Sequence, residues 1–121
     1  MSFTVVTKLW VEALMRRAST EGAFSTIERV GDEMRGDVIV KTRKPNGEIS
    51  LLGRAFTGSD EVAFQILTPE NAVLSDVEAN NYLSKRVSYD TDLWIVEIED
   101  REGRHFLTER VLPLIQDDPF L

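Results

Sequence analysis

Cysteine is absent from this chain of 121 residues, and histidine occurs once, as His105. Without cysteine there can be no disulfide framework, no thiolate nucleophile and no cysteine-ligated zinc. A Ser-His-Asp triad needs a histidine with suitable partners, and no Gly-x-Ser-x-Gly turn precedes a predicted helix. The sequence therefore does not favour nucleophilic hydrolysis, and His105 is interpreted as a half-exposed strand residue.

Long apolar runs and glycine-rich phosphate loops are absent as well. The longest apolar stretches, residues 93–96 and 111–115, are far too short to span a bilayer. The N-terminus lacks the basic start and the apolar block of a signal peptide. The seven glycines are dispersed, and they match neither the phosphate-loop motif Gly-x-x-x-x-Gly-Lys-Ser/Thr nor the dinucleotide-binding motif Gly-x-Gly-x-x-Gly. We therefore expect a cytoplasmic protein without membrane contact, and the sequence indicates no cofactor.

Basic residues are in deficit, with 14 lysines and arginines against 21 aspartates and glutamates and a net charge of −7. This balance argues against general nucleic-acid binding, which needs a basic surface. The negative charge would steer the protein toward basic partners, and we expect an unknown protein partner or self-association. With 42% hydrophobic and 29% charged residues, the composition is that of one folded domain over residues 1–121. Mobility is expected at its ends, 1–6 and 116–121.

Two segments have the spacing of amphipathic helices. The first spans residues 8–21, with Thr7 as the expected N-cap and Gly22 in the left-handed position after the helix. The second begins after Ser75, because Ser75 and Glu78 form a capping-box pattern. Residues 68–69 suggest a further short turn of helix. The apolar faces follow helical periodicity and consist of Val11, Leu14, Met15 and Ala18, and of Ala79, Tyr82, Leu83 and Val87.

Six strands are predicted from β-branched and alternating segments, at 24–30, 37–42, 48–55, 62–66, 93–99 and 105–108. Pro45, Asn46 and Gly47 indicate a hairpin that pairs 37–42 with 48–55 in antiparallel orientation. Short turns between strands indicate an α+β domain, with an antiparallel sheet of five or six strands and two helices packed on one face. The predicted order is α-β-β-β-β-α-β-β.

The segment 89–100 contains the clearest strand. Trp94, Val96 and Ile98 fall on one side of it, while the other side begins apolar and becomes acidic. We predict that this apolar side is the centre of the core, matched by Trp10 and Leu14 on the first helix. Exposure of either tryptophan in a binding pocket is the alternative interpretation.

Two blocks carry a resemblance to a known family. They are Leu9-Trp10-Val11-x-Ala13-Leu14-x-Arg16-Arg17 and Asp90-x-Asp92-Leu93-Trp94-Ile95-Val96-Glu97-Ile98-Glu99. Together with Gly22 and the pair Gly31-Asp32, they resemble the short bacterial proteins catalogued as domain of unknown function fourteen ninety-one. The resemblance extends over residues 9–109. It implies a compact stand-alone cytoplasmic domain and no particular chemistry.

Carboxylates are the only candidates for catalysis. Glu97 and Glu99 share a strand face about 6.8 Å apart, close enough to share a hard cation such as Mg²⁺. Glu12, Asp92, Glu97 and Glu99 could then serve a metal-dependent phosphodiesterase or nuclease. The acidic residue followed by Glu-x-Lys that is typical of such nucleases is incomplete here, because Ile39 stands in the glutamate position. Solvated carboxylates that discourage edge pairing are the simpler interpretation.

Two further groups are candidates for interaction. The basic residues Lys41, Arg43 and Lys44, with Arg54 across the hairpin, could grip a phosphate or form a soluble hairpin tip. Phe120 and Leu121 end an apolar tail that could pack on the sheet, pair with a neighbouring chain or dock on a partner. The sequence thus favours a non-enzymatic interaction or regulatory module, with the metal-dependent nuclease as its alternative.

Overall fold

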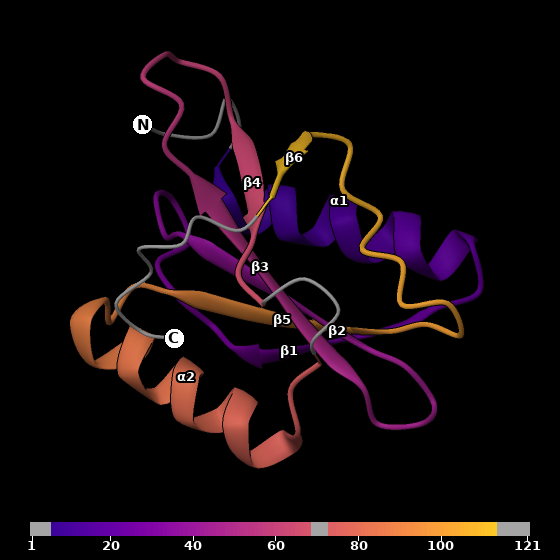
Figure 1. Ribbon diagram of the computed structural model, residues 1–121. Helices are drawn as coiled ribbons and strands as arrows, with labels where there is room; N and C mark the ends of the chain where they lie inside the picture. Colours follow the sequence, from indigo (N-terminus) through magenta and orange to yellow (C-terminus); the bar gives the residue numbers. More distant parts are fainter. Residues whose placement is uncertain (1–5, 69–72, 114–121) are drawn as a thin grey trace.

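A computed structural model describes residues 6–68 and 73–113 of the chain (Figure 1). Within these residues, two helices and six strands follow one another as α1 (Thr7–Thr20), β1 (Phe24–Arg29), β2 (Val38–Arg43), β3 (Ile49–Ala55), β4 (Ala63–Ile66), α2 (Asp76–Tyr89), β5 (Trp94–Glu99) and β6 (Arg110–Leu112). The strands form one sheet in the order β1-β5-β2-β3-β4-β6. The domain is thus α+β, as the sequence predicts.

The sheet is mixed, so the prediction of an antiparallel sheet is wrong. β5 lies between β1 and β2, antiparallel to β1 and parallel to β2. β6 is likewise parallel to β4, whereas β2-β3 and β3-β4 are antiparallel. The connection from β1 to β2 is therefore no hairpin, because it must pass around the start of an inserted strand. The predicted pairing across Asn46-Gly47 is confirmed, with Lys41 opposite Leu51.

The helices lie on opposite faces of the sheet, which corrects the prediction that both pack on one face. α1 packs with Val40, Val96 and their neighbours, while α2 packs with Ile39, Ile95 and theirs. Because side chains alternate along a strand, apolar residues at consecutive positions give β2 and β5 two faces to cover. Trp10, Leu14, Trp94, Val96 and Ile98 are all buried in the cluster beneath α1.

After β5 the described residues form a strand at Arg110–Leu112 and none at 105–108, so the predicted strand at 105–108 is wrong. The connection after β5 crosses the α1 side of the domain before β6 joins β4 (Figure 1). Phe106 has a φ of +59°, a left-handed conformation that cannot continue a strand. The backbone carbonyl of Phe106 accepts a hydrogen bond from Nε of Arg17 on α1. This contact holds the connection against the helix.

Local signals at the helix ends are confirmed except at Thr7. Ser75 and Glu78 form the reciprocal capping box, and Gly22 has a φ of +89° just after α1. The N-cap of α1 is Val6, which has no capping side chain. The hydroxyl of buried Thr7 instead donates to the carbonyl of Gly36 at 2.9 Å. Thr7 therefore ties the helix to the connection between β1 and β2.

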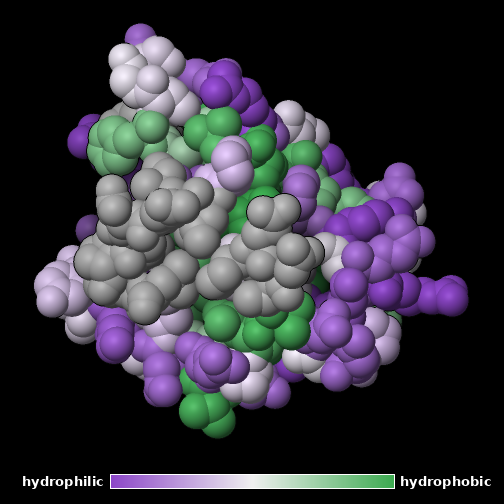
Figure 2. Space-filling model, viewed as in Figure 1, coloured by the Kyte–Doolittle hydropathy of each residue, from purple (hydrophilic) through white to green (hydrophobic). Residues whose placement is uncertain are grey.

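Some predicted features lie outside the described residues. They are the short turn that includes Pro69, the interaction candidates Phe120 and Leu121, and the ends 1–5 and 116–121. Within the described part of the chain, neither helix has the length and apolar character needed to cross a membrane. Hydrophilic residues cover most of the outline seen in Figure 2, while hydrophobic residues surface mainly toward the middle of this face.

Candidate functional site

Charged side chains from four elements meet on the face of the sheet that carries α2. They form what we call the ion-pair row, which consists of Glu28 (β1), Lys41 and Arg43 (β2), Glu97 (β5) and Asp76 (α2). The register explains the meeting, because Lys41 is the direct neighbour of Glu97 in the parallel β2-β5 pair. The β1-β5 register shifts between Ile27 and Arg29, and Glu28 lies at this irregularity.

Lys41 is the most buried member of the row. Its side chain is 3% exposed, and its Nζ lies 2.8 Å from Oε1 of Glu28 and 3.6 Å from Oε1 of Glu97. A buried ammonium is costly unless carboxylates surround it. The carboxylates of Glu28 and Glu97 satisfy this requirement, which explains how the side chain of Lys41 can be buried at this position.

Arg43 connects Glu97 with the start of α2. Its Nε donates to Oε1 of Glu97 at 2.8 Å, and its terminal nitrogens donate to both carboxylate oxygens of Asp76. The hydrogen bonds that Arg43 donates to Asp76 and, next in effect, to Glu97 raise the pKa of Arg43, and the hydrogen bonds from Arg43 lower the pKa of the Asp76 carboxyl. Asp76 is also in the first turn of α2, where the helix dipole favours a negative charge. The row thereby ties α2 to the sheet.

This arrangement brings together residues from both groups of sequence candidates and pairs them with each other. Basic Lys41 and Arg43 neutralise acidic Glu97, whereas Glu99 and Asp92 are exposed outside the row. Glu12 is exposed on α1, across the sheet from Glu97, so these two carboxylates cannot converge. Over residues 6–68 and 73–113, no group of three or more histidines, aspartates or glutamates could hold a metal ion.

Lys44 and Arg54 lie apart from the row. Lys44 forms an exposed pair with Glu48, its Nζ lying 3.6 Å from Oε2. Arg54 lies two residues after Leu52 on β3, so both side chains are on the α1 side of the sheet. There, Nη1 of Arg54 donates to Oδ1 of Asp37 at 2.8 Å. The four basic candidates therefore do not form a single cationic patch.

A groove lies next to the row, between α2 and the end of β1. We call it the α2 groove; its volume is about 400 Å³, and it is lined by Glu28, Arg29, Asn80, Leu83, Ser84, Val87 and Ile95. Leu83, Val87 and Ile95 provide apolar surface continuous with the core beneath α2. Exposed Asn80 and Ser84 form part of its polar margin. Arg29 is fixed there, because its Nη1 donates to the carbonyls of Thr91 and Leu93.

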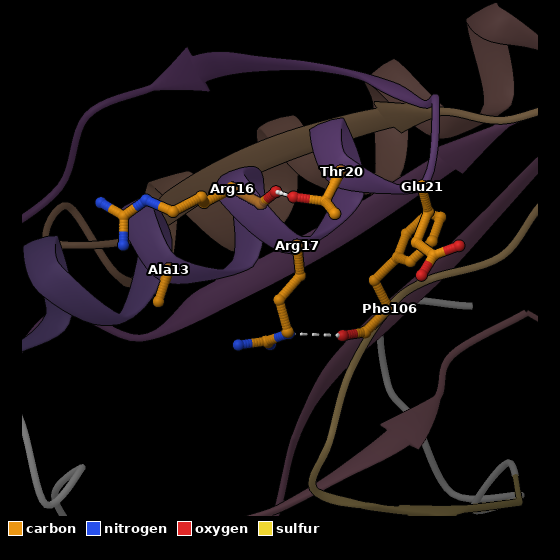
Figure 3. A pocket seen from close by; sticks show the side chains of 6 residues that line it. All are labelled: Ala13, Arg16, Arg17, Thr20, Glu21 and Phe106. Atoms are coloured by element: carbon orange, nitrogen blue, oxygen red, sulfur yellow. Dashed lines mark hydrogen bonds between the residues drawn. The ribbon is translucent and has the colours of Figure 1, made fainter.

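A second concave feature lies between α1 and the connection after β5. This α1 hollow has a volume of about 420 Å³ and is lined by Ala13, Arg16, Arg17, Thr20, Glu21 and Phe106 (Figure 3). The sequence analysis did not predict this hollow, because it placed residues 105–108 in a strand. The adjacent pair Arg16-Arg17 near the end of an apolar-faced helix was the available signal. The sequence around residue 106 does not indicate that Phe106 lines the α1 hollow.

Asp92 and Trp94, from the second of the two family blocks, form a tight structural junction with Gly31 and Gly36. A Cβ on Gly31 would lie 2.0 Å from the carbonyl oxygen of Asp92, and one on Gly36 would lie 2.4 Å from it. The indole of Trp94 contacts both glycines and donates from Nε1 to the carbonyl of Asp32 at 2.7 Å. These residues let the connection from β1 to β2 close around the start of β5. This structural role is enough to explain why these residues occur in the sequence, and no catalytic role is needed to explain them.

The fold and its paired charges define a small α+β domain in which two helices enclose a six-stranded mixed sheet. The model of the DUF1491 family, described as a protein of unknown function, matches residues 5–108. The chain belongs to this family, which confirms the resemblance stated from the tryptophan blocks.

Solved structures of relatives support the assignment. A crystal structure of a DUF1491 family protein from Caulobacter crescentus CB15 is 39% identical, with a TM-score of 0.79, and the match covers 88% of this chain and 98% of that one. An NMR structure of a DUF1491 family protein from the same organism is 38% identical, with a TM-score of 0.79 over 90% and 97%. Protein Atu0922 from A. tumefaciens is 29% identical, with a TM-score of 0.76 over 93% and 100%. No curated protein matches the chain.

Proposed function

We propose that the protein is a non-enzymatic interaction module of the cytoplasm that binds a protein partner through the α2 groove and the adjoining strand β1. The observation that carries the proposal is the groove itself, an apolar floor with a polar margin beside an open sheet edge. Apolar floors with a few placed polar groups are typical of binding sites.

Strand β1 supports the same surface. Among residues 6–68 and 73–113 it occupies one end of the strand order and pairs only with β5, so none of these residues covers the backbone groups of its outer edge, where an added strand could pair. Phe24 at its start is 77% exposed, which is unusual for a large aromatic side chain. An extended partner segment along β1 would lie beside the groove, where one of its apolar side chains could contact Val87 and Ile95.

The state of the charged residues favours binding over catalysis. General acid–base work needs a titratable group that can reach a substrate. Lys41, Arg43 and Glu97 are engaged with one another. The separation of Glu12 from Glu97 removes the grouping on which the nuclease alternative depended, and no other observation favours that alternative.

Asn80→Arg and Asn81→Arg form a matched pair for testing the proposal. Both residues are exposed on α2, but only Asn80 lines the groove. An arginine at position 80 adds a long charged side chain to the groove, while the same residue at position 81 changes charge and helix propensity equally. The tagged wild type and both variants would be used to capture partners from the native cytoplasm, and each captured protein would then be purified and titrated against all three.

We expect a partner that binds the wild type and Asn81→Arg alike and binds Asn80→Arg at least about tenfold more weakly, a loss of about 1.4 kcal/mol. Sedimentation of each purified protein over a concentration series would show whether that partner is a second copy. Equal binding by both variants would contradict the assignment of the groove.

A further inference from the structure

We propose that the α1 hollow is a binding site for a small oxyanion, with the guanidinium of Arg17 as its principal recognition group. This site lies on the opposite face of the sheet from the α2 groove, and it does not depend on the proposed protein partner. The ligand class is a phosphate or carboxylate head group.

The bonding of Arg17 is incomplete in a way that points to a ligand. Its Nε donates to the carbonyl of Phe106 at 3.1 Å, which fixes the plane of the guanidinium. Its Nη2 is shielded from water and has no hydrogen-bond partner among the described residues. A shielded guanidinium nitrogen without an acceptor is costly, since charged donors lose the most when left unpaired. An oxyanion in the hollow would offer the guanidinium an acceptor and a negative charge once Nη2 turns toward the cavity.

The surroundings of Arg17 give the hollow a cationic and an apolar wall. Arg16 adds a second positive charge in a chain of net charge −7, and Ala13 and Phe106 add apolar surface. Figure 3 shows Arg17 extending from α1 toward the backbone of Phe106. The Glu21 carboxylate lies 3.9 Å from Nη1 of Arg104, whose guanidinium also stacks on Phe106 at 4.9 Å. The one acidic lining residue is therefore directed to another cation.

The backbone of Phe106 provides a second, independent sign of a specialised site. Its φ of +59° is uncommon for an aromatic residue and persists only where surrounding contacts hold it. Here the conformation turns the carbonyl to Arg17 while the ring lines the hollow. Strained conformations of this kind gather at binding sites because they present groups that regular structure cannot.

Nuclear magnetic resonance of the whole ¹⁵N-labelled chain tests the proposal through the arginine Nε–H signals. Inorganic phosphate is titrated in one arm and benzoate in another, at constant ionic strength, because benzoate carries its carboxylate on a ring that could pack on Phe106. We expect a saturable shift of the Arg17 signal with at least one of the two anions. The arm that saturates at lower concentration identifies the head group.

Three variants make the test specific. Arg17→Gln, followed through the Nε–H signal of Arg16 and the backbone amides around the hollow, should weaken binding about tenfold or more, as expected for a lost charged hydrogen bond. Arg35→Gln removes an equal charge from an exposed position outside the hollow and should leave binding unchanged. Ala13→Leu fills the hollow while keeping Arg17 and should also abolish the shift. Absence of saturation in both arms would overturn the proposal, as would equal weakening by Arg35→Gln or full binding by folded Ala13→Leu.

Discussion

Glu97 on β5 accepts a hydrogen bond from Nε of Arg43 on the neighbouring strand β2, at 2.8 Å. The same carboxylate lies 3.6 Å from the ammonium of buried Lys41. The acidic side of β5 is therefore part of the interaction between sheet and α2. Glu97 therefore has a structural role, and the concave surfaces of the domain are the better candidates for a functional site.

Glu97→Gln should lower the free energy of unfolding by about 1–3 kcal/mol, because it removes the negative charge that accepts a hydrogen bond from Arg43 and forms an ion pair with Lys41. Glu99→Gln on the same strand is the matched control, since Glu99 is exposed and a change there should stay within about 0.5 kcal/mol. Urea unfolding of both variants measures the difference. Equal effects at the two positions would show that Glu97 has no special role in the row.

Trp94→Ala should cost about 3–5 kcal/mol, because it empties a buried site and removes the hydrogen bond to the carbonyl of Asp32. Phe56→Ala is the comparison, since Phe56 is 91% exposed and its truncation should change stability little. Thermal and urea unfolding provide the readout. A Trp94→Ala variant as stable as wild type would mean that the ring is a pocket wall rather than core.

Gly31→Ala should destabilise by about 3 kcal/mol, at the upper end for overpacking, because the new Cβ meets the backbone of Asp92. Gly47→Ala serves as the control. Its φ is +90° but nothing lies within 4 Å of the new Cβ, so only the backbone penalty of about 1 kcal/mol is expected. A smaller loss at position 31 than at position 47, measured by urea unfolding, would refute the tight junction.

Asp100 should make stability depend on pH in the acidic range. Hydrogen bonds from Arg104 lower the pKa of this buried carboxyl from 3.8 to about 2, helped by the backbone N–H groups of Arg104 and Glu102. A lowered native pKa stabilises the fold fully above the unfolded value, and the contribution is lost as pH falls from about 4 through 2. Urea unfolding at several pH values should show that the free energy of unfolding changes less with pH in this window for Asp100→Asn than for the wild type. An unchanged slope would count against the assignment.

Local features of this fold could be read from the sequence because neighbouring residues determine them. Ser75 and Glu78 predicted the start of α2, and Asn46-Gly47 predicted the β2-β3 hairpin; the structure confirms both. Thr7 does not cap α1 as its sequence position predicts, since its hydroxyl donates to the carbonyl of Gly36 rather than accepting from its own helix. A capping pattern identifies residues able to cap, while tertiary contacts decide which ones do.

Non-local features could not be read in the same way. Periodicity assigns residues to strand faces but does not say which strands are neighbours, so the insertion of β5 between β1 and β2 was missed. Ile39 and Ile95 could have indicated that helices cover both faces of the sheet, because strands with apolar residues on both faces are usually buried on both sides. The ion-pair row and the α1 hollow depend on that arrangement. Their residues could be nominated from sequence, but their partners could not.

The central claim, binding of a protein partner at the α2 groove, is tested most directly by titrating unlabelled partner into the ¹⁵N-labelled chain. Backbone amide shifts should map to a continuous surface formed by residues 24–29, 80–87 and 95. They should disappear in Asn80→Arg and persist in Asn81→Arg. Shifts confined to the α1 side of the sheet, around residues 13–21 and 104–107, would contradict the claim and place the contact surface on the other face.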